Sequence, residues 1–96
     1  MTLRKLQAEA HRIAQEHGFW DAPRETGTLL ALVHSEISEA LEADRHGDRG
    51  GLAHELADAV IRIVDLAAGL EFDLQSFVET AMKENETRPR KHGKAY

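Results

Sequence analysis

The sequence contains no cysteine and only two prolines, and aromatic residues make up 5% of it. The absence of cysteine excludes disulfide bonds and thiolate metal ligands and is typical of a reducing compartment, so we expect a cytoplasmic protein. No stretch approaches the ~20 apolar residues of a membrane span, so no membrane is expected as a partner. The first residues, 1–5, lead into an amphipathic pattern and lack the apolar stretch of a signal peptide.

Apolar residues are plentiful, at 42%, and 30% of the residues are charged. This composition favours a packed domain over a disordered chain, and the length predicts a single domain over residues 1–96. The formal net charge of −5 argues against binding to nucleic acid. Positive charge is concentrated in a basic tail, about residues 86–96, behind an acidic body.

Apolar residues recur at helical spacing in four segments, and no alternating pattern predicts a strand. The fold class is therefore all-α, with helices expected at about residues 2–17, 26–45, 52–68 and 73–85. Thr2 and Asp73 are suitable N-caps, and the Gly-rich segment 46–51 is expected to end the second helix. Trp20 lies in a loop before Pro23, either as an anchor on the helical body or beside a ligand.

The second and third predicted helices are joined by this short loop, so they should pack as an antiparallel hairpin. Their apolar faces are wide and rich in alanine and leucine. Because so short a chain has little else to cover them, we expect a homo-oligomer, with a homodimer as the simplest case.

Two pairs of acidic residues stand in the hairpin, Glu36 with Glu39 and Glu55 with Asp58. The i, i+3 spacing places both members of a pair on one helix face. Carboxylates gathered in this way repel one another unless a cation lies between them, and hard oxygen ligands suit Mg²⁺ or Mn²⁺.

A purely structural interpretation also fits the acidic residues. Glu55, Asp58, Arg62 and Asp65 form a continuous polar stripe, and such stripes are usually solvated faces. Glu36 and Glu39, however, border the apolar face, where an unpaired charge is costly. Arg62 could be their partner in place of a metal.

Three segments, residues 34–42, 55–65 and 85–94, resemble the MazG-like nucleotide pyrophosphohydrolases in their order and spacing. The resemblance implies an all-α enzyme that converts a nucleoside triphosphate to the monophosphate and pyrophosphate. It also implies a homodimer or a homotetramer. It implies Mg²⁺ as the cofactor, held by an E-x-x-E and an E-x-x-D motif. The matching positions, implied as both metal-binding and catalytic, are Glu36, Glu39, Glu55 and Asp58.

The remaining site residues are those expected to contact the nucleotide, most of them at its phosphates. Basic residues of the tail would meet them, unless that tail is simply solvated. The expected substrate-binding residues are Trp20, Lys83, Asn85, Arg88, Lys91, His92 and Lys94. Two positions depart from the family pattern: Ser35 replaces a frequent glutamate, and Ala81 replaces a frequent lysine.

The expected reaction is attack of water on the α-phosphorus, with Glu39 as the candidate base. Removal of non-standard nucleotides is a role that the family often has. Two alternatives stay open: a phosphoribosyl-ATP pyrophosphohydrolase-like enzyme, and a non-catalytic helical oligomerisation or regulatory module. His34 and His54 are interpreted as surface or packing residues.

Overall fold

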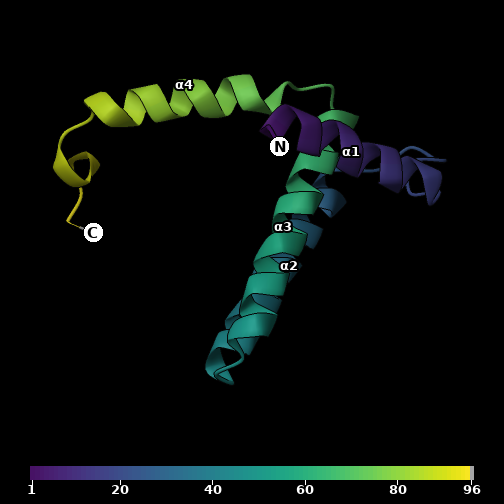
Figure 1. Cartoon of the computed structure of the whole chain (residues 1–96), viewed down its shortest axis with the longest axis horizontal. Coiled ribbons are helices and arrows are strands. Elements are labelled where there is room, and N and C mark those ends of the chain that lie inside the picture. The colour runs from purple at the N-terminus through teal and green to yellow at the C-terminus, as the bar shows by residue number, and fades with distance from the viewer. Residues whose placement is uncertain (96) are drawn as a thin grey trace.

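The computed structural model describes residues 1–95. Over these residues the regular secondary structure consists only of helices, which are joined by loops. These residues form four α-helices followed by a short 3₁₀ turn, and Figure 1 shows how they are arranged. Their bounds are α1 Leu3–Glu16, α2 Thr26–Arg45, α3 Arg49–Gly69, α4 Leu74–Thr87 and η1 Arg90–Gly93. The predicted fold class is confirmed.

The helices α2 and α3 lie side by side as a long hairpin, and α1 crosses α3 at the end of the hairpin away from its loop (Figure 1). This is the hairpin that the sequence predicts. The core along these contacts is built mostly from small side chains, which let the helices approach closely. Its buried apolar members are Ala10, Leu29, Ala40, Ala59, Val64, Leu66 and Ala67.

The predicted start of the third helix is wrong by three residues. The segment 46–51 was expected to be non-helical throughout, but α3 begins at Arg49 and includes Gly50 and Gly51. Asp48 is the N-cap, and its side chain accepts a hydrogen bond of 2.9 Å from the backbone N–H of Gly51. A Cβ on Gly51 would lie 2.3 Å from Oδ2 of Asp48, so this glycine makes room for the cap rather than ending a helix.

The last α-helix leaves the body of the molecule as an arm (Figure 1). Polar contacts fasten its start to α1: the backbone N–H of Leu74 donates to the Gln7 side chain at 3.3 Å, and Arg4 pairs with Asp73 at 2.8 Å. Phe77 and Met82, farther along the arm, are 65% and 63% exposed. The Cα radius of gyration is 15.7 Å, whereas a compact domain of this length has about 13 Å. The arm thus leaves apolar surface uncovered within a single chain.

Across residues 1–95, none of the helices has both the length and the apolar character that crossing a membrane requires.

Candidate metal centre

Three of the four predicted ligands meet between the two helices of the hairpin. Glu36 and Glu39 come from α2 and Glu55 from α3, and one carboxylate oxygen of each lies within 4.8 Å of the others. Glu36 is buried, with only 7% of the residue exposed, whereas Glu55 is half-buried and Glu39 is exposed. The i, i+3 spacing on α2 therefore does bring its two glutamates to the same edge, facing α3.

The protein satisfies this group of carboxylates only in part. Oε1 of Glu36 accepts a hydrogen bond of 2.7 Å from Nε of Arg62. Oε2 of Glu36 and Oε2 of Glu55 are buried and have no hydrogen-bond partner among residues 1–95. Buried polar atoms without a partner are rare, and a bound cation is one arrangement that would satisfy both oxygens.

The charges in the group also shift the pKa values of Glu36 and Glu55. Arg62, followed by Glu55, lowers the pKa of Glu36 below its usual 4.5. The contacts of Glu55 with Glu36 and then Glu39 raise the pKa of Glu55 to about 7. Glu55 thus holds a proton at slightly acid pH, because a second negative charge beside Glu36 is unfavourable.

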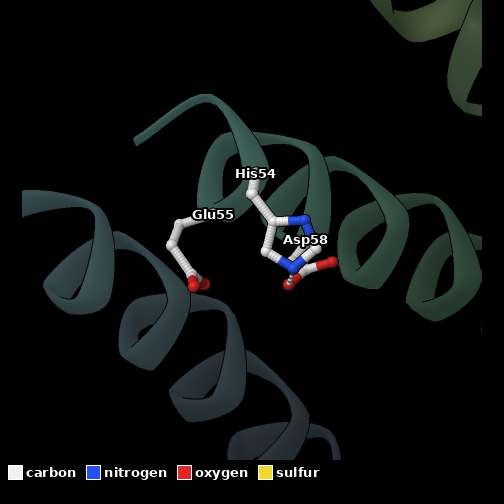
Figure 2. A group of neighbouring side chains, drawn as sticks. All are labelled: His54, Glu55 and Asp58. Carbon is white, nitrogen blue, oxygen red and sulfur yellow. Dashed lines mark ion pairs between the residues drawn. The ribbon is translucent and has the colours of Figure 1, made fainter. Parts of the chain in front are cut away.

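Asp58 lies in a second, overlapping group with Glu55 and His54, whose candidate ligand atoms also fall within 4.8 Å of one another. Nε2 of His54 is 3.2 Å from Oδ2 of Asp58, one helical turn apart on α3. Figure 2 shows the carboxylate of Glu55 extending toward the neighbouring helix, with the His54 ring beside Asp58. Glu55 is therefore the residue common to both groups.

These residues fit a hard divalent cation. Two buried carboxylate oxygens without partners, Oε2 of Glu36 and Oε2 of Glu55, provide charge and donor atoms. Glu39 belongs to one of the two groups that contain Glu55 and Asp58 to the other, so each can add an oxygen to the set. A set of carboxylates of this kind suits Mg²⁺ or Mn²⁺ better than the softer metals.

A cavity of about 330 Å³ adjoins the carboxylates. Its polar end includes Glu36, Asp58 and Arg62, and its apolar wall comes largely from α1. This volume falls in the range of ~300–1,000 Å³ that small-molecule pockets have. The lining residues are Ala10, Ile13, Ala14, His17, Phe19, Arg24, Glu36, Asp58, Ile61, Arg62 and Asp65.

Asp65, which also lines this cavity, holds side chains of α1 and of the following loop. Its Oδ1 lies 2.8 Å from Nδ1 of His11 and accepts a hydrogen bond of 3.0 Å from Nε1 of Trp20. The guanidinium of Arg24 stacks on Trp20 and Phe19, at 5.0 Å and 5.7 Å from their ring centroids. Trp20 is thus an anchor of the loop on the helical body, and it holds Phe19 and Arg24 beside the cavity.

The predicted phosphate-binding residues of the C-terminal region lie elsewhere in this chain. Lys83 and Asn85 are on the α4 arm, and the basic residues that follow, up to Lys94, lie at its far end (Figure 1). All are exposed, and none lines the cavity or belongs to either carboxylate group.

Several contributors to the site were not predicted as functional from the sequence. The sequence pattern grouped Asp65 with a solvated stripe, yet its side chain is largely buried, with only 14% exposed. Its partners His11 and Trp20 are 54 and 45 positions away, so no local spacing reveals them. Arg62 was considered only as an alternative to a metal, and it does pair with Glu36.

Comparison with known proteins places these observations in a family. A search of curated proteins and one of solved structures each gave no match. The family model of the MazG nucleotide pyrophosphohydrolase domain matches residues 24–92, which include all of α2, α3 and α4. This match covers well over half of the sequence and contains all four predicted ligands. The chain therefore belongs to the MazG nucleotide pyrophosphohydrolase domain family.

Proposed function

We propose that this protein is a Mg²⁺-dependent nucleoside triphosphate pyrophosphohydrolase. The observation that carries the proposal is the pair of buried, unpartnered oxygens of Glu36 and Glu55 beside a nucleotide-sized cavity. Glu36, Glu39, Glu55 and Asp58 would hold the cation. When bound, Mg²⁺ polarises phosphate oxygens, lowers the pKa of water and offsets the charge of a leaving pyrophosphate.

The reaction needs no nucleophile from the protein. A water oxygen forms a bond to the α-phosphorus, the bond from that phosphorus to the bridging oxygen breaks, and pyrophosphate leaves. We assign the proton of the attacking water to a carboxylate oxygen of Glu39, which is the exposed member of its group. Glu36 is less suited to accept a proton, because Arg62 lowers its pKa.

The cavity supports the placement of the nucleoside end of the substrate. Phe19 and Ile13 give its lining an apolar part, while Glu36, Asp58 and Arg62 give it a polar part. A nucleoside triphosphate has the same division between a flat base and a charged chain. We therefore place the base near the loop that Trp20 anchors, and the phosphates near Glu36 and Asp58.

A second copy of the chain is part of the proposal. Large apolar side chains on the outer face of the hairpin are about half exposed, among them Ile37 at 48%, Leu41 at 50% and Leu56 at 49%. Burial of this face and of the α4 arm against a second copy would remove apolar surface from water. Light scattering at micromolar concentration should give at least twice the chain mass of 10.7 kDa. A monomer would contradict this part of the proposal.

Release of pyrophosphate is the direct test of the activity. Ordinary and modified NTPs and dNTPs, together with phosphoribosyl-ATP, are incubated with the protein in Mg²⁺ or in EDTA. We expect Mg²⁺-dependent release of pyrophosphate from at least one nucleoside triphosphate. Preference for phosphoribosyl-ATP would favour the biosynthetic alternative. No release from a folded protein would favour a non-catalytic helical module.

A further inference from the structure

Two guanidinium groups line the cavity, and their surroundings differ. Arg24 stacks on two aromatic rings and lies 3.9 Å from Oδ2 of Asp65, so its charge is balanced at the base end. Arg62 lies beside the carboxylate of Glu36, near which we place the phosphates of a bound nucleotide, and it also borders a smaller pocket with Arg24 and Asp65. Of the cationic side chains in residues 1–95, it is the one paired with Glu36.

The pairing of Arg62 uses only part of its hydrogen-bonding capacity. Nε donates to Oε1 of Glu36, and Nη1 and Nη2 have no acceptor among residues 1–95. An arginine side chain has five N–H donors in a planar fork, so four remain. The side chain of Arg62 is 40% exposed, so these donors are accessible. Such a fork matches two oxygens of one phosphate group.

The bond to Glu36 also leaves room for a cation. Arg62 occupies Oε1 of Glu36, whereas the buried Oε2 has no partner. The guanidinium and a cation can therefore share Glu36, one on each oxygen. A residue in this position lies beside the cation ligands and also faces the cavity.

We propose that Arg62 is a phosphate-binding residue, which holds Glu36 through Nε and binds the triphosphate of the substrate through Nη1 and Nη2. The inference rests on the proposed function, because it takes the carboxylates as the cation site. It differs from the sequence-based expectation, which assigned the phosphate contacts to the basic tail. Arg62 supplies that contact from within the same chain.

The test uses Mn²⁺ alone and Mn²⁺ with inorganic tripolyphosphate as probes, so that no base needs to be known. Binding to the full chain is measured by calorimetry for wild type, Arg62→Gln and Arg62→Lys. Arg45→Gln is the matched control, because Arg45 carries the same charge on α2 but does not line the cavity. Circular dichroism and melting temperature check the fold of each variant.

We expect Arg62→Gln to weaken tripolyphosphate binding by about 10- to 100-fold, as loss of charge-assisted hydrogen bonds does. Mn²⁺ binding without phosphate should be unchanged or tighter, since a positive charge near the ligands is removed. Arg62→Lys keeps the charge but not the fork, so its tripolyphosphate affinity should be intermediate. Arg45→Gln should match wild type.

A merely structural Arg62 would give a different pattern. In that case Arg62→Gln would lose Mn²⁺ and tripolyphosphate affinity in parallel, or would leave both unchanged, and either result overturns the inference while the proposed function stands. A wild-type protein that binds no Mn²⁺ would overturn the proposed function and this inference with it.

Discussion

Replacing Glu55 with Gln is expected to reduce pyrophosphate release by about 100-fold or more, a larger loss than removal of an outer-shell partner causes. Glu55 belongs to both carboxylate groups, and its Oε2 is buried without a partner. Gln keeps the size of the side chain but removes a negative charge and one of the oxygens. The measurement is kcat for pyrophosphate release at saturating Mg²⁺, with Mn²⁺ binding by calorimetry beside it.

The same variant should be more stable than wild type when no metal is present, and the difference should depend on pH. The pKa of Glu55 is raised from 4.5 to about 7, so folded wild type retains a proton that the unfolded chain has released in this window. The stability that this proton contributes is fully present below pH ~4.5 and is lost as pH rises toward 7. In EDTA, the melting temperature of wild type should therefore fall through this window, and that of Glu55→Gln should fall less.

The lowered pKa of Glu36 affects stability in a different pH range from the raised pKa of Glu55. Its contribution is present above its usual pKa of 4.5 and is lost only as pH falls below that value. Glu42→Gln is the matched control, since Glu42 is an exposed glutamate of α2 that pairs with Arg45. The control should keep full activity and the wild-type pH dependence. Unchanged activity in Glu55→Gln would contradict the assignment of this residue as a ligand.

Replacing Gly69 with Ala is expected to destabilise the fold strongly. A Cβ at this position would lie 2.1 Å from an atom of the Trp20 ring, and this ring is held by its hydrogen bond to Asp65. Gly69 is the last residue of α3, where the backbone conformation also suits alanine. Alanine has the higher helix propensity, which by itself would stabilise the helix, but the clash with the Trp20 ring acts against this gain. Overpacking of this kind costs about 1–3 kcal/mol. In a domain of this size, each kcal/mol lowers the melting temperature by about 4–8 °C.

Thermal unfolding followed by circular dichroism measures the effect, and Trp fluorescence reports on the ring itself. Gly50→Ala is the matched control, because Gly50 lies in α3 like Gly69. Its Cβ would be at an ordinary contact distance of 3.8 Å from the Asp48 side chain. That variant should be as stable as wild type or slightly more stable. Equal melting temperatures for the two variants would show that the Trp20 ring moves aside without cost.

Local spacing was enough to predict the helices and the acidic pairs. The i, i+3 pairs on α2 and α3 depend on helix geometry alone, and a short connection between the helices brings them together. The glycines at the start of α3 misled the prediction, because Gly51 serves the Asp48 cap. A glycine that makes room for a side chain and a glycine that ends a helix look the same in a sequence.

Contacts between distant segments could not be predicted in this way. The pairing of Asp65 with His11 depends on how α1 crosses α3, which no periodicity specifies. The polar contacts at the start of α4, such as Arg4 with Asp73, likewise join residues 69 positions apart. The position of the basic tail relative to the carboxylates was therefore beyond the reach of spacing.

The arrangement of the cavity has an evolutionary consequence. Every candidate cation ligand comes from the α2–α3 hairpin, between Glu36 and Asp58, whereas α1 and the loop that Trp20 anchors supply most of the apolar wall. Under the proposed function, mutations in α1 or in this loop would change which base is accepted without altering a cation ligand. A lineage built on this fold can diverge in substrate while its phosphate chemistry stays the same.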